Sequence, residues 1–435
     1  MLGNRWSLTE NLTYLLLTLV VVSSWTDING IFAELPQIIL TQPERWKLGA
    51  YLALVTNFGN IAPATLVLIK CLYKKRRLNP IPINYIVIII GMLSCFLLIF
   101  FWQHTTIIRN QQFSSALLAL AFFLSLLDCT SSVTFADYIQ GFRKEFTSTL
   151  FLGESLTSIV PSLLAIAQGN GQLDCVSSTN GTKDIQQVVY KTARFSVSTY
   201  FLCLFFLLTI SLISFVLLQW TSIARSARQN LLELSLKTTE DDIETMNSFF
   251  EQTPVSFESS RLTATSLVFL LFGCAYTSSI LFGMLLSISP YVLMPYGHHI
   301  FYFGTVLSPW MLTLVWVLGM VKPLMPKIYV FILILIGSIT FLFNMFVAFK
   351  SPCPPYVNTL KGDILILTIW LSTYVLLGYP RLIIANYVRD YCSSGMFWYG
   401  VSVQLGALFG SILNYHLIEI FSLFNEKMPC EQINC

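Results

Sequence analysis

The sequence predicts an all-α polytopic membrane protein with about eleven transmembrane helices. Apolar runs of roughly 20 residues fill most of the 435-residue chain, and a helix of that length matches the hydrocarbon core of a bilayer. Charged residues make up only 11% of the chain, whereas soluble domains carry about 25%. Because lipid offers the backbone no hydrogen-bond partners, unbroken apolar runs of this length must form helices and not barrel strands.

The first six apolar runs form the N-terminal part of the predicted bundle. The first run is too long for a cleaved signal peptide, and Asp27, Asn29 and Glu34 stand where small cleavage-site residues would be expected. Boundaries are expected to hold to within about four residues. The six spans are predicted at residues 12–34, 48–70, 83–103, 113–139, 147–168 and 196–220.

A polar segment at residues 221–263 interrupts the series of spans. It begins with Arg225 and Arg228, becomes acidic around residues 240–244, and contains Pro254 and several serines. This composition is typical of a cytoplasmic linker and not of a domain. Five further spans are predicted after it, at residues 264–288, 297–321, 327–349, 362–387 and 394–421.

This order divides the chain into two halves. We expect an N-terminal half of six helices at residues 1–220, the cytoplasmic linker at 221–263, and a C-terminal half of five helices with an extracellular tail at 264–435. Two helical halves joined by one central loop are the layout of many alternating-access transporters. The sequence has no Walker A run or other nucleotide-binding loop, so ATP is not expected to drive transport.

Basic residues predict the orientation of the chain in the membrane. They gather in alternate loops, within residues 70–77, 143–144 and 322–327. Cytoplasmic loops carry such an excess of lysine and arginine. The N-terminus is therefore expected in the cytoplasm, and an odd number of spans places the C-terminus outside.

Two features of the loops agree with that orientation. Asn180 begins an Asn-Gly-Thr glycosylation sequon in a loop predicted to be extracellular. Extracellular segments also allow disulfides to persist, and the cysteines predicted to lie there are Cys175, Cys353, Cys430 and Cys435. We expect Cys353 to pair with Cys430 or Cys435, with free surface thiols as the alternative.

Polar residues inside the predicted spans are the candidates for function. Each is costly in lipid and tends to face a cavity or a partner helix. Trp25 and Asn29 are four residues apart and share one helical face. The deeper polar residues of the later spans are Asp128, Ser132, Glu154, Arg381 and Gln404. The candidates for an ion pair or a proton site are Asp128, Glu154 and Arg381.

Some of these residues have an alternative structural role. Glu34 lies at the predicted outer interface, where hydration would explain it. Asp137 lies near the cytoplasmic end of its span and is expected to pair with a loop cation such as Arg143. Arg381 has a long side chain that could extend to the inner interface.

Two glycines in the last predicted span indicate packing. Gly406 and Gly410 form a small-xxx-small pair, a pattern that lets two helices approach closely. We therefore expect another helix to lie against this face, and we assign these glycines no binding role.

Several strings in the chain resemble those of one known family. Residues 25–36, Trp-Thr-Asp-Ile-Asn-Gly-Ile-Phe-Ala-Glu-Leu-Pro, resemble the first-span signature of the eukaryotic riboflavin transporters, solute carrier family 52. Residues 351–355, Ser-Pro-Cys-Pro-Pro, are similarly specific. Weaker matches occur, in the same order as in the family, at residues 129–135, 151–156, 161, 168–169, 173, 175, 295–297 and 403–406. The resemblance covers essentially the whole chain.

The resemblance implies eleven spans, a cytoplasmic N-terminus and facilitative riboflavin uptake at the plasma membrane. It also implies a fold like that of the major-facilitator and equilibrative nucleoside carriers. Glu154 departs from the glutamine of vertebrate members, and in the second half Leu281-Phe282 replace a Thr-Asn pair. Two alternatives therefore stay open: a carrier of another planar solute, such as a nucleoside or another vitamin, and a membrane receptor that transports nothing.

Riboflavin sets clear requirements for a site, because it joins a planar ring with a polar edge to a chain of hydroxyls. Aromatic faces, amides, hydroxyls and carboxylates in an otherwise apolar pocket would satisfy it. The residues predicted to bind it are Trp25, Asn29, Glu34, Ser132, Glu154, Tyr276 and Gln404. We predict no enzyme, cofactor, metal site or nucleic-acid partner, since no His-Glu-x-x-His, Gly-x-Ser-x-Gly or cysteine–histidine spacing is present.

Overall fold

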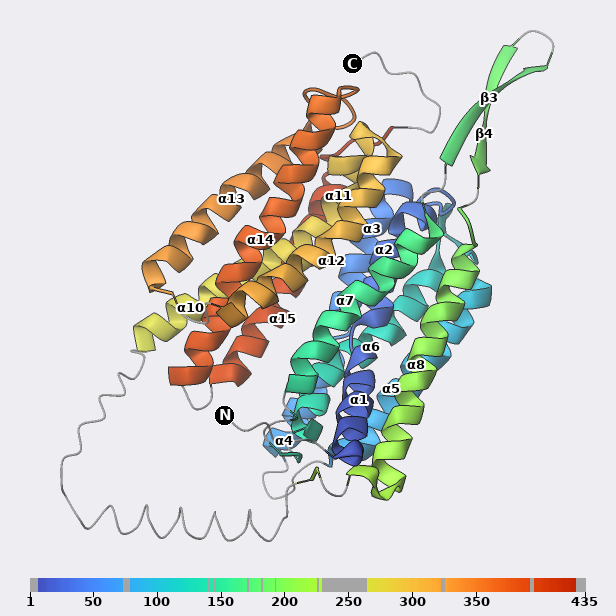
Figure 1. The fold of residues 1–435 in the computed structure, drawn as a ribbon. Helices are drawn as coiled ribbons and strands as arrows, with labels where there is room; N and C mark the ends of the chain where they lie inside the picture. Colours follow the sequence, from blue (N-terminus) through green and yellow to red (C-terminus); the bar gives the residue numbers. More distant parts are fainter. Residues whose placement is uncertain are drawn as a thin grey trace, which may run out of the picture.

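The computed structural model shows a bundle of long helices that run between two ends (Figure 1). These ends are called upper and lower as they appear in that figure. The structure describes residues 7–72, 79–139, 141–143, 146, 148–169, 172–180, 183–191, 193–224, 227–228, 264–321, 325–391 and 395–427.

The N-terminal half contains eight α-helices and two hairpins among the described residues. Its helices are α1 (Leu8–Val22), α2 (Thr26–Ile38), η1 (Arg45–Lys47), α3 (Leu48–Phe58), α4 (Ile61–Leu72), α5 (Pro80–Phe101), α6 (Ser115–Ile139), α7 (Ser148–Gln168), α8 (Val197–Trp220) and η3 (Ser222–Ala224). Its antiparallel hairpins are β1–β2 (Thr106–Ile108 and Gln111–Phe113) and β3–β4 (Gln172–Asn180 and Lys183–Lys191). The sequence analysis assigned both hairpin segments to loops, so the strands are an addition to it.

The C-terminal half contains helices alone in the part that the structure describes. They are α10 (Ala264–Ser278), η4 (Ser279–Met284), α11 (Leu285–Leu293), η5 (Met294–Tyr296), α12 (His298–Val321), α13 (Lys327–Phe349), α14 (Leu360–Tyr391), α15 (Gly395–Tyr415) and η6 (His416–Ile420). The two halves lie side by side in Figure 1, blue to green and yellow to red.

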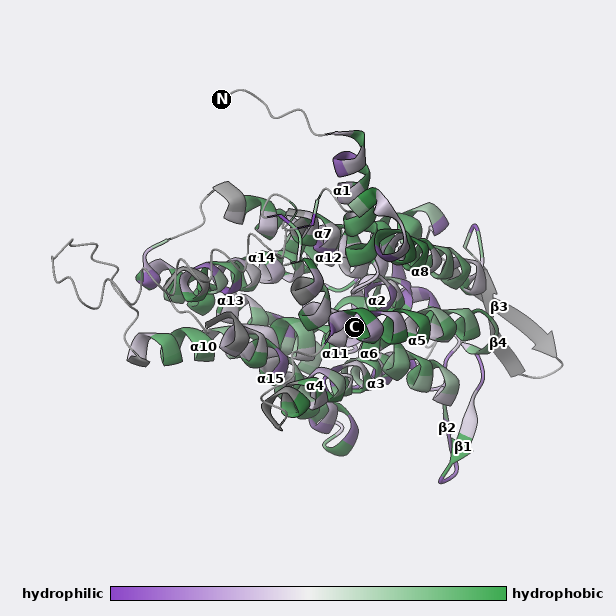
Figure 2. Ribbon diagram, turned by 90° about the horizontal axis from the view of Figure 1, so that it is seen from below, coloured by the Kyte–Doolittle hydropathy of each residue, from purple (hydrophilic) through white to green (hydrophobic). Residues whose placement is uncertain are grey.

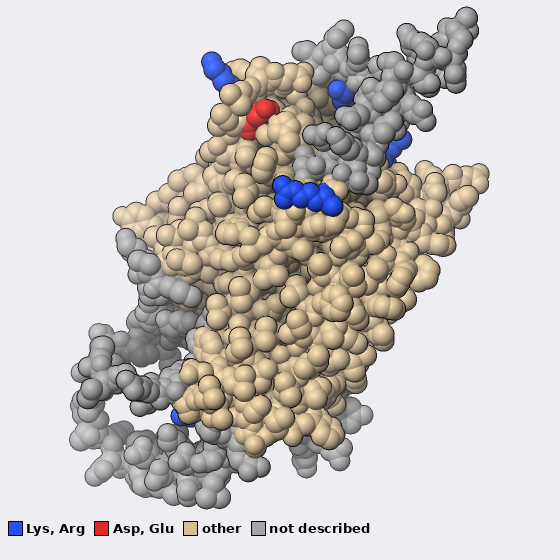
Figure 3. All heavy atoms as spheres, turned by 45° about the vertical axis from the view of Figure 1, so that its right-hand side comes forward, with Lys and Arg blue, Asp and Glu red and all other residues tan. Residues whose placement is uncertain are grey.

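The helices have the length and apolarity of membrane spans. Among the described residues, eight helices qualify, or nine if α1 and α2, bent by 52°, make one span. Predicted spans 48–70 and 147–168 coincide with α3 plus α4 and with α7, which lie in the same bundle. In Figure 3 the charged side chains lie near the two ends and the broad middle carries none. The protein is a multi-pass membrane protein, and the count of eleven spans stays a prediction.

The first predicted span is broken at residues 23–25, between α1 and α2. The hydroxyl of Ser23 donates to the Val20 carbonyl (2.7 Å), and that of Thr26 donates to the Val22 carbonyl. The Val20 carbonyl also accepts from the Ser23 N–H and the Ser211 hydroxyl, so polar groups satisfy the carbonyls at the end of α1. The bend places Trp25, the residue before α2, in the interior of the bundle and not on a continuous helix.

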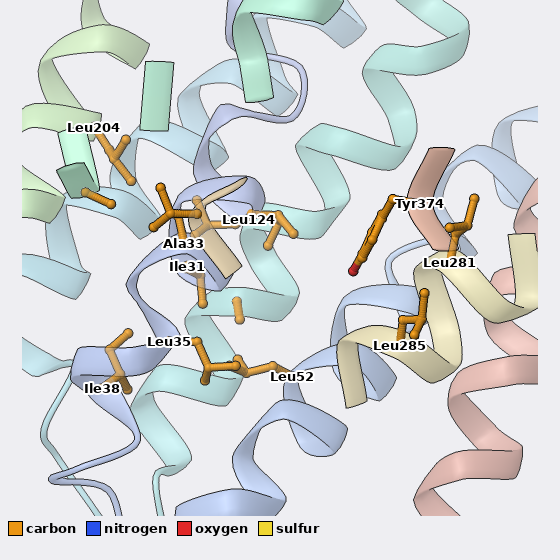
Figure 4. Packing of buried hydrophobic residues seen from close by; sticks show 14 of the residues in the cluster. Ile31, Ala33, Leu35, Ile38, Leu52, Leu124, Leu204, Leu281, Leu285 and Tyr374 are labelled. Carbon is orange, nitrogen blue, oxygen red and sulfur yellow. The ribbon is translucent and has the colours of Figure 1, made fainter. Parts of the chain in front are cut away.

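Buried apolar side chains form a core that crosses both halves. Figure 4 shows part of this cluster: Ile31 and Leu35 of α2 lie near Leu52 of α3, and Leu281 and Leu285 extend the cluster into the C-terminal half. In Figure 2 much of the surface of the bundle is hydrophobic, as expected of faces that meet lipid.

Contacts between the halves gather at the upper end. The ammonium of Lys47 lies 2.9 Å from the carboxylate of Glu419, and the Tyr302 hydroxyl donates to the Ala165 carbonyl (2.9 Å). Further contacts at this end join His298 to the Pro36 carbonyl, and the ring of Trp46 to that of Tyr291. The structure is therefore one in which the upper ends of the halves are held together.

Cys353 takes part in a disulfide bond, whereas Cys95, Cys129, Cys203 and Cys274 are free. The predicted partners Cys430 and Cys435 lie outside the described residues, as does the side chain of Cys175. The segment before the tail does reach this loop: the Ser351 hydroxyl donates to the Asn425 carbonyl (2.8 Å), and Phe349 stacks on Phe424. A bridge from Cys353 to the tail therefore stays the prediction.

We expect Cys353 to resist a membrane-impermeant maleimide in intact cells and to react after mild reduction. A disulfide sulfur has no thiolate with which to attack the reagent. Replacing the partner alone should expose Cys353, so one of Cys430→Ser and Cys435→Ser should make it reactive without reductant, and the other should not. Labelling of Cys353 in the unreduced wild type, read by peptide mapping, would contradict the bridge.

Candidate functional site

Trp25 and Ser132 meet inside the N-terminal half. The indole Nε1 of Trp25 donates to the hydroxyl of Ser132 on α6 (3.2 Å). Ser132 is exposed and Trp25 partly exposed, although both lie within predicted spans. The structure therefore brings together two of the predicted binding residues, one aromatic and one a hydroxyl.

Asn29 contacts α7 from the second turn of α2. Its Nδ2 donates to the Thr157 carbonyl (3.3 Å) and lies 3.4 Å from the hydroxyl of Ser158. The Thr157 hydroxyl in turn donates to the carbonyl of Glu154 (2.7 Å). Asn29 of α2 thus contacts α7 one turn away from Glu154.

Glu154 of α7 interacts electrostatically with the other half of the protein. Its charge interacts with that of Arg381 on α14, yet among the described residues the two form no ion pair, for which the limit is 4.0 Å. The side chain is partly exposed, and neither carboxylate oxygen accepts a hydrogen bond or is closed off from solvent. Glu154 therefore has open acceptor positions.

Arg381 is held by aromatic residues and does not extend to the inner interface. Its Nε donates to the hydroxyl of Tyr399 on α15 (3.2 Å), and its guanidinium carbon lies 4.6 Å from the ring centre of Phe282 in η4. These contacts fix the plane of the guanidinium, and among the described residues its two terminal nitrogens donate no hydrogen bond. The alternative of a snorkelling arginine is thus not what the structure shows.

Phe282 and Tyr399 were missed by the sequence analysis. Phe282 drew notice only as a departure from a family pattern, and Tyr399 lies among many other span aromatics. No sequence signal singles out Tyr399, because it stands five residues before Gln404 and the two do not share a helical face. Gln404 is partly exposed and, in the part of the chain that the structure describes, makes no hydrogen bond.

Two predicted residues lie elsewhere. The Tyr276 hydroxyl pairs with that of Ser338 on α13 (2.9 Å), on the far side of α10 from the N-terminal half. Glu34 is fully buried, and its carboxylate accepts from the amide of Gln168 at the end of α7 (2.8 Å). Glu34 is thus neither hydrated at an interface nor beside Glu154, and the structure groups neither residue with the others.

The carboxyl of Asp128 meets another carboxyl and not a cation. Asp27 and Asp128 are both fully buried and their side chains face each other. Asp128 therefore forms no ion pair among the described residues, and the expected pairing with a cation is not what the structure shows. Both residues lie in the N-terminal half, on α2 and α6, and no basic side chain is among their described electrostatic neighbours.

Arg143 has a different partner from the one expected. Its guanidinium forms an ion pair with Glu10 at the start of α1, and the side chain of Asp137 lies outside the described residues. The expected pair of Asp137 with Arg143 therefore has no support. The Glu10–Arg143 pair instead ties α1 to the loop between α6 and α7.

The grouped residues share one chemical character. Asn29, Glu154 and Arg381 supply donors and acceptors, and Trp25, Phe282 and Tyr399 supply ring faces. They come from both halves: α2 and α7 on one side, η4, α14 and α15 on the other. In Figure 2, α7, α12 and α14 lie next to one another where the halves meet. Such a set suits a polar, planar solute that contacts both halves at once.

Comparison with known proteins places the whole chain in one group. Residues 9–426 match the family model described as solute carrier family 52, riboflavin transporter. The zebrafish (Danio rerio) riboflavin transporter member 3-A is 32% identical over 95% of this chain and 97% of its own. The human member 3 is 28% identical over 96% of this chain and 98% of its own.

Solved structures with similar folds are also transporters. The crystal structure of the nucleoside transporter NupG superposes with a TM-score of 0.54 at 11% identity, over 95% of this chain and 92% of that one. A bacterial homologue of the lysosomal transporter Spinster gives 0.51 at 13% identity, over 97% and 83%. At these identities the likeness shows the fold alone, which is that of major-facilitator-like carriers.

Proposed function

Because this chain belongs to solute carrier family 52, the riboflavin transporters, we propose that it moves riboflavin into the cell across the plasma membrane by alternating access. The observation that carries the proposal is the family match over residues 9–426. The relatives are named as transporters, so we propose a carrier and not an enzyme.

The grouped side chains support this substrate. Riboflavin is uncharged and planar, so it needs ring faces and hydrogen-bond partners and no net charge at the site. We propose Trp25 and Phe282 as ring contacts, and Asn29, Ser132, Glu154 and Gln404 as polar contacts. Glu154 and Arg381 have opposite charges, so the group as a whole stays neutral for a neutral ligand.

We further propose that the upper end of the bundle faces outside. The sequon residue Asn180 ends β3 and the disulfide-bonded Cys353 follows α13, both at this end (Figure 1), and the basic predicted loops belong to the other. The N-terminus is then cytoplasmic and the C-terminus extracellular. In this orientation, the Lys47–Glu419 pair and its neighbours would close the outer side of the carrier.

Uptake of labelled riboflavin tests the proposal. Cells that express the protein should accumulate the label faster than cells with an empty vector, and excess unlabelled riboflavin should abolish the difference. A panel with nucleosides and other vitamins is expected to compete weakly. The proposal fails if a surface-exposed protein gives no accumulation above the control, or if another solute competes better than riboflavin itself.

A further inference from the structure

The charges of Glu154 and Arg381 interact across the two halves, and among the described residues the two side chains form no ion pair. The Glu154 carboxylate, on α7, accepts no hydrogen bond, and the terminal nitrogens of Arg381, on α14, donate none in the described structure, since its Nε alone is used, by Tyr399. Both side chains are partly exposed. An unfilled charge inside a membrane bundle is costly, so a partner that occupies both groups would stabilise the site.

The two groups have opposite roles when Glu154 is ionised. An ionised carboxylate only accepts hydrogen bonds, and a guanidinium only donates them. The Arg381 group is also held in one plane, by the Phe282 ring below it (4.6 Å) and by the Tyr399 hydroxyl (3.2 Å). A ligand that spans the pair must therefore present a donor to Glu154 and, close to it in the same plane, an acceptor to Arg381.

We propose, resting on the function proposed above, that Glu154 and Arg381 together recognise the imide edge of the ligand ring. In that edge an N–H group stands between two carbonyls, at N3 between C2 and C4 of the riboflavin ring. Glu154 accepts from the N–H, and Arg381 donates to an adjacent carbonyl oxygen. Such charge-assisted hydrogen bonds are the stronger kind.

This arrangement gives the pair a role in specificity and in movement. A ring with the edge intact joins α7 of one half to α14 of the other. A ring without the N–H gives Glu154 no hydrogen-bond donor. A site built around a hydrogen bond rejects a ligand that cannot form that bond. The ribityl hydroxyls are less suited to the pair, because each hydroxyl both donates and accepts and so does not require two opposite charges.

The first experiment compares two competitors against labelled riboflavin in the wild type. Unlabelled riboflavin has the N3–H, and 3-methylriboflavin has a methyl group there. We expect the methylated compound to compete about 5- to 150-fold more weakly, the range for one lost buried hydrogen-bond partner. If riboflavin is taken up and the two compounds compete equally, the edge is not recognised, and the inference fails while the proposed function stands.

The second experiment tests which residue accepts the hydrogen bond from the ring N–H. In Glu154→Ala the partner is gone, so the two competitors should differ by less than about twofold, a coupling that only contacting groups show. In Arg381→Gln that difference should persist while riboflavin itself binds more weakly. Arg109→Gln is the matched control, since Arg109 is exposed in the β1–β2 hairpin. This variant should keep the wild-type affinity for riboflavin and the wild-type difference between the two competitors.

The carbonyl contact is tested with the 2-thio and 4-thio analogues, whose sulfur is a poor acceptor. One of them should compete more weakly than riboflavin in the wild type and equally in Arg381→Gln. If 3-methylriboflavin still competes much more weakly than riboflavin in Glu154→Ala, Glu154 does not contact the imide edge. If Glu154→Ala does not reach the surface, Glu154→Gln, which accepts through an uncharged oxygen, should show a reduced penalty, and an unreduced one overturns the assignment.

Discussion

Asn29→Ala and Glu154→Ala are each expected to weaken riboflavin uptake by about 5- to 150-fold, because each removes a hydrogen-bond partner of the bound substrate worth roughly 1–3 kcal/mol. Asn29 of α2 contacts Thr157 of α7, which lies one turn from Glu154. Both side chains are partly exposed, so their removal leaves the core intact. The measurement is initial uptake rate against riboflavin concentration, normalised to surface-biotinylated protein.

Two further variants serve as controls for this expectation. Glu154→Gln should be much milder, since it retains an acceptor oxygen and is the residue that vertebrate members of the family are expected to have. Gln111→Ala, on exposed β2, should leave uptake unchanged and controls for the loss of an amide. Unchanged half-saturation in both alanine variants, at normal surface level, would show that neither residue binds the substrate.

The features predicted from sequence are those that local composition determines. The hydrocarbon thickness alone makes a run such as residues 83–103 a spanning helix, and α5 (Pro80–Phe101) bears this out. The spacing of Trp25 and Asn29 predicted one shared helical face, whereas in the structure Trp25 precedes α2 with a non-helical backbone and Asn29 lies within that helix. Gly406 and Gly410 do pack closely against another helix, so that prediction is confirmed.

The features that could not be predicted depend on partner helices. Which way a helix rotates about its axis is set by its neighbours, so Tyr276 was predicted to face the site although it pairs with Ser338 on α13. The same holds for Arg381, whose length allowed it to reach the inner interface but whose neighbours Tyr399 and Phe282 hold it inside. Asp27 of α2 and Asp128 of α6 face each other, and this contact could not be predicted because the two residues are far apart in the sequence.

The break at residues 23–25 shows a further limit. The apolar run 12–34 is continuous by hydropathy, and nothing in its length requires a bend. The serine and threonine hydroxyls that satisfy the free carbonyls of α1 are common inside spans. Their effect depends on whether α2 finds a better packing direction, which the core around Ile31 and Leu35 provides.

Gly410→Ala is expected to destabilise the folded protein by about 3 kcal/mol, the upper end of the usual range for overpacking. A Cβ at Gly410 would stand 2.2 Å from the backbone oxygen of Ser279, and one at Gly406 would stand 2.1 Å from that of Ala275. These are backbone atoms, so relief requires α15 to move away from α10 and η4. Gly406→Ala should therefore act in the same way.

Gly400 of the same helix is the matched control, because a Cβ there would meet nothing within 4 Å. Alanine stabilises an open helical position by roughly 0.5–1 kcal/mol relative to glycine, so Gly400→Ala and Gly410→Ala should shift stability in opposite directions. The thermal midpoint of the detergent-solubilised protein, followed by size-exclusion chromatography, measures both. If the thermal midpoint of Gly410→Ala equals or exceeds that of the wild type, the packing of α15 does not depend on this close approach. The contact between α15 and η4, next to Phe282 of the proposed site, would then need revision.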